Sequence, residues 1–160
     1  MTEIDKILNT TSDFDLCDGV FCSFADLDND LHADRYDEAE RIVTLVWHSM
    51  GIVENGGFHY LFESDFNGDP GYKLTAEAFK VIGAEVAYQA FIEIMYHFPK
   101  GLPSDIKMRL KLYEEIPDEE ANRINELFWG DLKTIETQLA QYIRLHSEDV
   151  KRILTAKNKK

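Results

Sequence analysis

The chain has 160 residues, 44% of them hydrophobic and 12% aromatic, which is typical of a globular protein and argues against disorder. Thirty acidic against 17 basic residues give a net charge of −13, which disfavours direct binding to nucleic acid because phosphate recognition needs Lys and Arg surfaces. No apolar run approaches the ~20 residues that span a bilayer, so no membrane-spanning helix is expected.

The N-terminal segment and the cysteines predict a cytoplasmic protein. Met1 to Asp5 is polar and acidic and lacks the basic and apolar regions of a signal peptide. Cys17 and Cys22 form no CxxC or zinc pattern, so we expect both to be buried, reduced thiols. The length favours a single domain over residues 1–160.

Three helices are predicted in the first third of the chain. The first covers residues 2–9. Apolar residues spaced three and four apart predict a second helix over residues 20–31. A longer apolar stripe predicts a third helix over residues 34–53, with Asp34 as its N-cap.

A glycine pair follows this third helix in the segment 54–58, Glu-Asn-Gly-Gly-Phe. Each glycine in a helix interior costs about 1 kcal/mol relative to alanine, and glycine readily takes positive φ, so the chain is expected to change direction here. The dipeptide Asn55-Gly56 is also a hairpin signal, but its flanks lack period-two alternation. We therefore predict a structural corner between two helices, with Phe58 and Phe62 packed against the next long helix.

The apolar pattern then predicts one long helix over residues 75–98, capped by Thr75. This helix is apolar over most of its circumference and is therefore expected at the centre of the protein. Further helices are predicted to begin after Pro103, Pro117 and Asp131.

The last part of the chain leaves one alternative open. A segment from Ser147 either continues the preceding helix or restarts it, and a basic tail over about residues 156–160 is expected to fray. Because no strand alternation occurs, the fold class is predicted to be all-α. We expect a single compact domain of about six to eight helices around the central buried helix 75–98.

The acidic residues are concentrated in the N-terminal quarter. Residues 13–40 hold ten of the thirty acidic residues and one basic residue, Arg35. Within them, residues 26–37 resemble a calcium-binding loop at the first five positions. Leu31, however, stands where that loop needs glycine, and Asp37 stands where it needs glutamate. We therefore expect no calcium site.

No catalytic or cofactor motif is present. The five histidines are scattered, and no HExxH, nucleophile-elbow, phosphate-loop or dinucleotide-binding motif occurs. Glu93 and His97 are four residues apart and share a helix face, which favours a hydrogen-bonded pair over a metal site. We therefore predict a non-enzymatic protein with no metal and no cofactor.

The segment 54–62 resembles the signature of the DMP19-like family, which is named for a bacterial DNA-mimic protein. The family pattern is a long helix, then Asn-Asn-Gly-Gly-Phe, a variable residue, Gln and two aromatics. The residues that match are Asn55, Gly56, Gly57, Phe58 and Phe62. Glu54 replaces the first Asn and Tyr60 stands in place of Gln. The resemblance covers about residues 34–130.

The resemblance implies an acidic helical protein that imitates the phosphates of DNA and occupies the basic surface of a DNA-binding protein. Duplex DNA carries one charge per about 1.7 Å, and carboxylates at i and i+4 lie about 6 Å apart along a helix axis, so helix faces and loops can present a comparable column. Two acidic clusters are the candidates for the partner-binding surface: Asp26, Asp28, Asp30, Asp34, Asp37 and Glu38 in the first, and Glu114, Glu115, Asp118, Glu119 and Glu120 in the second.

The alternative is that both clusters are solvated faces and helix caps. The first functional hypothesis is a non-enzymatic protein that binds a basic partner, such as a DNA-binding protein, and thereby regulates transcription. The second is an immunity or regulatory protein that neutralises a basic toxin or nuclease. A metal-dependent enzyme is the weakest alternative. Neither a nucleic acid nor a membrane is an expected partner, and a homodimer is compatible with the sequence.

Overall fold

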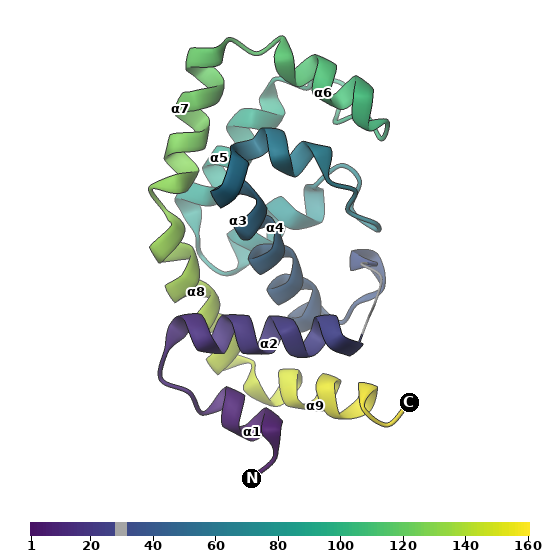
Figure 1. The fold of residues 1–160 in the computed structure, drawn as a ribbon, viewed down its shortest axis with the longest axis vertical. Coiled ribbons are helices and arrows are strands. Elements are labelled where there is room, and N and C mark those ends of the chain that lie inside the picture. Colours follow the sequence, from purple (N-terminus) through teal and green to yellow (C-terminus); the bar gives the residue numbers. More distant parts are fainter. Residues whose placement is uncertain (28–31) are drawn as a thin grey trace.

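The computed structural model describes residues 1–27 and 32–160, and the regular elements in these ranges are all helical (Figure 1). The prediction of an all-α fold is confirmed. The described ranges hold more helices than predicted: α1 (Glu3–Leu8), α2 (Asp13–Leu27), the 3-10 helix η1 (Ala33–Arg35), α3 (Glu38–Glu63), α4 (Lys73–Val81), α5 (Glu85–Tyr96), α6 (Ile106–Glu114), α7 (Asp118–Trp129), α8 (Leu132–Leu145) and α9 (Ser147–Lys157).

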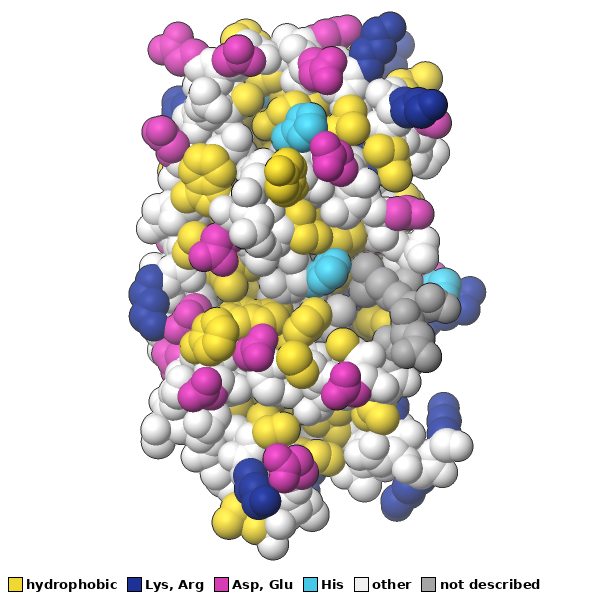
Figure 2. Space-filling model, in the orientation of Figure 1, with side chains coloured by type: hydrophobic (Ala, Val, Ile, Leu, Met, Phe, Trp, Pro, Cys, Tyr) yellow, Lys and Arg dark blue, Asp and Glu magenta, His cyan; other side chains and the backbone are white. Residues whose placement is uncertain are grey.

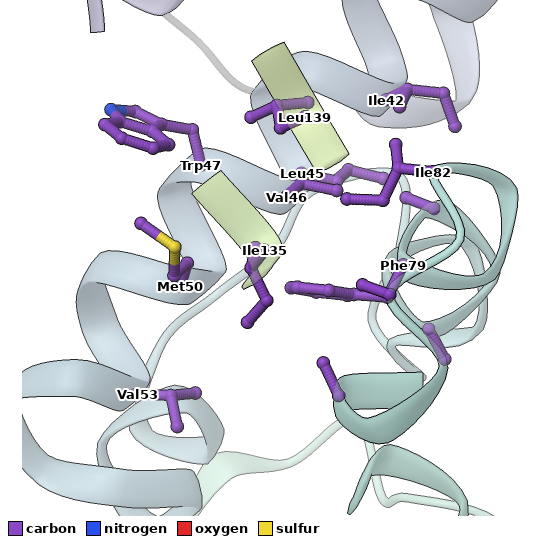
Figure 3. Close-up of a cluster of buried hydrophobic side chains, with 14 of the residues drawn as sticks. Ile42, Leu45, Val46, Trp47, Met50, Val53, Phe79, Ile82, Ile135 and Leu139 are labelled. Carbon is purple, nitrogen blue, oxygen red and sulfur yellow. The ribbon is translucent and has the colours of Figure 1, made fainter. Parts of the chain in front are cut away.

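The central helix is α3 and not the predicted 75–98 segment. It packs against α2, α4, α6, α7, α8 and α9, whereas α1 lies on the side of α2 away from it (Figure 1). Figure 3 shows part of the resulting core, in which Val46 of α3 lies among side chains of α4 and α8. Phe79 and Ile135, from those two helices, are fully buried there. A helix that contacts so many neighbours has to be apolar on several sides, as the buried positions of α3 are.

The predicted helix 75–98 is two helices. α4 ends at Val81 and α5 begins at Glu85, and between them Gly83 has a φ of +81°, which is left-handed backbone that favours glycine. The neighbours Ile82 and Ala84 are both buried. The apolar spacing therefore runs through the break because the chain on both sides of Gly83 faces the same core, and this is why the pattern concealed the interruption.

Two buried aspartates accept backbone N–H groups at the starts of helices. The Asp131 carboxylate accepts a hydrogen bond from the Ala87 backbone N–H in the first turn of α5 (3.1 Å), and its side chain makes no capping hydrogen bond to α8. Asp69 accepts the backbone N–H groups of Leu74 and Thr75 at the start of α4, together with the Thr75 hydroxyl. The Thr75 hydroxyl is thus a donor to the cap, and the prediction that Thr75 caps the helix is wrong.

Three further outcomes concern the ends of elements, and one of them decides the alternative left open at Ser147. Asp34 lies in η1 and not at the start of α3, which begins at Glu38. The segment from Ser147 is a separate helix, α9, and it includes Lys157, which forms an ion pair with the buried Glu40. The tail predicted to fray at about residue 156 therefore begins beyond Lys157.

The two cysteines have different environments. Cys17 is buried as expected, whereas Cys22 is exposed, because its position on α2 faces away from the core. Burial is the main cause that raises the pKa of the Cys17 thiol to about 12. Cys17 is therefore a neutral thiol that packs as a small apolar side chain.

Candidate partner-binding surfaces

The predicted glycine corner is a kink inside α3. Gly57 has a φ of +70° there, and a Cβ at Gly57 would lie 2.8 Å from the Asn125 side chain of α7. The Asn125 Oδ1 atom accepts the Phe58 backbone N–H at 3.0 Å, and the Trp129 Nε1–H donates to the Val53 carbonyl at 2.7 Å. Side chains of α7 therefore satisfy backbone groups at the kink. The Phe58 N–H is occupied by Asn125, so that donor is not available to an anion.

The kink turns two aromatic side chains of α3 into the core. The Phe58 ring lies 5.1 Å from the ring of Phe91 in α5 and 5.7 Å from that of Phe128 in α7, both edge to face. Phe62 makes a similar contact with Phe98, just after α5. The predicted packing of Phe58 and Phe62 is thus present, on the second half of the 75–98 segment. The corner is filled by side chains and serves to position helices.

A buried arginine, Arg109, binds backbone carbonyls at the C-terminal end of α3, and the sequence did not predict this role. The Arg109 guanidinium of α6 donates to the backbone carbonyls of Phe62 and Ser64 at the end of α3, and to the Pro103 carbonyl before α6. Positive charge at the C-terminus of a helix is favourable. The spacing offered a signal, because Arg109 is three residues after Ile106 and four before Tyr113, on the inward side of α6.

The first acidic cluster is exposed where the structure describes it. Asp26 lies at the end of α2, Asp34 in η1, and Asp37 and Glu38 at the start of α3. Asp28 and Asp30 lie outside the described residues, together with the rest of positions 28–31 of the calcium-like loop. Asp37 is 3.9 Å from the Arg152 guanidinium of α9, so part of its charge is offset.

The second acidic cluster lies at the α6–α7 junction. Its members Glu114, Glu115, Asp118 and Glu119 are exposed, and Glu120 is half-buried. The Arg123 guanidinium donates to the Glu120 carboxylate at 2.8 Å and also contacts Glu93 of α5. These bonds to Arg123 are the main cause that lowers the pKa of both Glu93 and Glu120.

The predicted pairing of Glu93 with His97 is replaced by contacts between helices. Glu93 binds Arg123 and Gln89, and the His97 Nε2 atom is 3.8 Å from Glu120. The physical reason is that α7 packs directly on α5. This packing brings Arg123 to Glu93 and Glu120 to His97.

The described members of the first acidic cluster do not meet the second cluster. The first adjoins the start of α3 and the second lies beyond its kink, at the opposite end of the helix (Figure 1). Glu38 and Gly56 are eighteen positions apart in α3, or about 27 Å at 1.5 Å per residue. The two clusters therefore do not form one continuous acidic face for a flat partner surface.

A third acidic surface is formed by the outward side of α2, and only its last member was among the predicted residues. Asp15, Asp18 and Asp26 lie on this side together with Phe14 and Cys22, which we call the α2 face. No Lys or Arg occurs in Asp13–Leu27. The helical spacing of the three aspartates could have indicated this surface. The prediction instead followed the calcium-loop-like pattern that begins at Asp26.

Figure 2 shows the side of the molecule on which α2 lies in front. Asp, Glu and hydrophobic side chains are spread across it, whereas most Lys and Arg side chains lie at its edges. In residues 1–27 and 32–160, no group of three or more His, Cys, Asp or Glu side chains is arranged to hold a metal ion. None of the helices in the same ranges is long and apolar enough to span a membrane.

The model of the DMP19-like protein family matches residues 34–146. The chain belongs to this family. The match includes α7, as the 34–130 range of the resemblance does, and extends beyond that range to cover all of α8; the contacts of both helices with α3 were described above. None of the curated proteins and none of the solved structures compared with this DMP19-like protein matches it.

Proposed function

We propose that this DMP19-like protein is a non-enzymatic binding protein that imitates DNA and occupies the DNA-binding surface of a basic protein. The observation that carries the proposal is the combination of its family with a net charge of −13. A protein that binds DNA presents a surface of Lys and Arg, and a folded polyanion competes for that surface through the same electrostatic attraction.

The α2 face supports this proposal geometrically. Asp15 and Asp26 are eleven residues apart, which is about 16 Å along a helix axis, and Asp18 lies between them. A duplex carries about nine or ten phosphate charges over that length at about 1.7 Å per charge, so the three aspartates match the sign and extent of this array at about a third of its charge density. Because the carboxylates stand on a packed helix, little backbone ordering is required when a partner binds.

The buried and half-buried acids support a binding role over a catalytic one. Asp69 and Asp131 each accept backbone N–H groups at a helix start, and Glu120 accepts from Arg123. Each of these carboxylates therefore has a structural partner that holds it in place. The acids without such partners lie at the surface, where they act through charge.

The proposal is tested with a captured partner and its own DNA. The purified protein is immobilised, incubated with lysate of the source cells, and eluted with rising salt. A retained DNA-binding protein is then purified and bound to its labelled duplex. We expect the DMP19-like protein to displace that duplex, with an affinity that falls as salt is raised. If no DNA-binding protein is retained, or if the duplex stays bound at saturating concentration, the proposal is wrong.

A further inference from the structure

We propose that the α2 face, together with the aromatic pair Phe14 and Trp47, docks a basic protein segment that also carries apolar side chains. This inference rests on the proposed function and assigns it to one surface of the molecule. It also adds a requirement that a purely electrostatic mimic does not have, namely apolar contact at one end of the acidic column.

The acids of this face form no ion pair with a residue that the structure describes. Within the parts of the chain that the structure describes, no Lys or Arg forms an ion pair with Asp15, Asp18 or Asp26. The remaining acid of α2, Asp13, lies at its start and pairs with Arg144 at 2.8 Å. No neighbouring Lys or Arg in the described residues therefore competes with a partner for the outward carboxylates of α2.

An exposed aromatic side chain stands beside these carboxylates. Phe14 is 53% exposed, and its ring meets the Trp47 ring of α3 edge to face at 5.6 Å. The Trp47 Nε1–H in turn donates to the Asp18 Oδ1 atom at 3.1 Å. Aromatic ring and carboxylate are thus fixed next to each other, which suits a partner that places Arg or Lys beside an apolar side chain.

The Cys22 thiol lies on the α2 face between Asp18 and Asp26 in the sequence. Partial desolvation of the exposed Cys22 thiol is the first cause that raises its pKa, and the negative charges of Asp18 and Asp26 add to it. The Cys22 Sγ atom lies 3.9 Å from the Asp18 Oδ2 atom. Asp18 and Asp26 each lie four residues from Cys22, so all three side chains project from the same side of α2.

Apart from Asp26, the described members of the two predicted acidic clusters are less suited to this role. Asp37 in the first cluster has Arg152 beside it, and Glu120 in the second has Arg123. A shallow depression on α6 brings Glu115 together with Lys111. Positive side chains at these places lower the attraction for a basic partner, and the complementarity of charge points to the α2 face.

The experiment uses two synthetic helical peptides of equal positive charge. One carries Arg on one side and Leu on the other, and in the control peptide Ser replaces every Leu. The protein has two tryptophans, so a ¹H–¹⁵N spectrum contains two indole N–H signals, which a Trp129→Phe variant assigns. We expect the Leu peptide to shift the Trp47 indole signal and the α2 amides, and to bind more tightly than the Ser peptide at raised salt.

Two charge-matched triple variants locate the site. Asp15→Asn, Asp18→Asn and Asp26→Asn remove the column but keep an acceptor for the Trp47 N–H, and we expect the affinity for the Leu peptide to fall about tenfold. The control carries Glu114→Gln, Asp118→Asn and Glu119→Gln at the other end of the molecule, and little loss is expected. Phe14→Ser should weaken the Leu peptide and leave the Ser peptide unchanged.

Each other outcome overturns the inference. If the control triple loses as much affinity as the α2 triple, the docking surface is elsewhere, while displacement of DNA from a captured partner would still support the proposed function. If the two peptides bind with equal affinity, apolar contact does not contribute to docking and that part of the inference is wrong. A concentration-dependent dimer that the α2 triple abolishes would show that a second copy covers this face. Failure of the captured partner to release its DNA counts against the proposed function itself.

Discussion

The glycine corner and the α2 face are two regions of this protein with opposite surroundings. At the corner, Gly57 and Phe58 are fully enclosed by side chains of α5 and α7. On the α2 face, Phe14 and Asp15 are exposed and face solvent. The residues that identify the family at the corner thus build the fold, whereas the face that we propose for binding contributes little to it.

The difference shows that a family signature and a functional surface need not coincide. Buried glycine and phenylalanine positions tolerate few substitutions because neighbouring atoms surround them. Exposed acids can be exchanged for other acids or moved by one helical turn without loss of stability. To distinguish the structural role of the corner from the binding role of the α2 face, stability and binding must both be measured on the same variants.

Replacement of Phe58 by alanine should give the largest effect. The ring is fully buried against Phe91 and Phe128, so its removal leaves a cavity and is expected to cost about 3–5 kcal/mol of the free energy of unfolding. Denaturant unfolding followed by far-UV circular dichroism measures this loss. The folded fraction should bind the Leu peptide with unchanged affinity, and a selective loss of binding would contradict the comparison.

Gly57→Val is expected to cost roughly 2–4 kcal/mol. A side chain there meets positive φ and the Asn125 side chain at 2.8 Å, which strains the backbone and disturbs the hydrogen bond to Phe58. Calorimetry should show a melting temperature lower by several degrees. Gly51→Ala is the control, because a Cβ there meets nothing within 4 Å in a helical segment, and a gain of up to about 1 kcal/mol is expected. An unchanged melting temperature for Gly57→Val would show that the corner is not a structural requirement.

Arg123→Met should lower stability in a pH-dependent way. Arg123 depresses the pKa of Glu93 and Glu120, so its stabilising effect is present above the ordinary carboxylate pKa of about 4.3 and is lost as the pH falls. The melting temperatures of the variant and the parent should differ modestly near neutrality and converge in acid, as thermal scans over a pH series would show. Asn122→Met, at the adjacent exposed position, is the control and should run parallel to the parent at every pH.

The α2 triple variant should have the smallest effect on folding. Asp15, Asp18 and Asp26 make no ion pair among the described residues, so their exchange for asparagine should change the free energy of unfolding by no more than about 0.5 kcal/mol. Denaturant unfolding beside the parent protein tests this. A large loss of stability would mean that the face is part of the folding framework, and the contrast with the corner would fail.

The structure agrees best with predictions that depend on neighbouring residues. The all-α fold, the corner at Gly57 and the helix starts near Pro103 and Pro117 follow from propensity, backbone freedom and capping, which act over one or two helical turns. The break at Gly83 was missed for a different reason. A single glycine within an uninterrupted apolar pattern is compatible with a continuous helix, and the pattern records burial but not the direction of the chain.

The predicted acidic partner-binding residues show the same limit of arguments from sequence spacing alone. The sequence identified the acidic N-terminal quarter and included Asp26, but it weighted the loop after α2 above the helix itself. The partners that decide which acids remain available, such as Arg152 for Asp37 and Arg123 for Glu120, come from other helices. No spacing rule within one segment contains that information.

The amino-acid sequence by itself determined the helical fold class, the kink at Gly57 and the strong negative charge, because local backbone preferences and composition act without reference to distant residues. Only the tertiary structure decided that α3 is central, that Asp131 caps α5 and that the two predicted acidic clusters lie apart. It also placed Phe14, Trp47 and Asp18 together. These outcomes depend on contacts between residues remote in the chain, which only the packing of one helix on another creates.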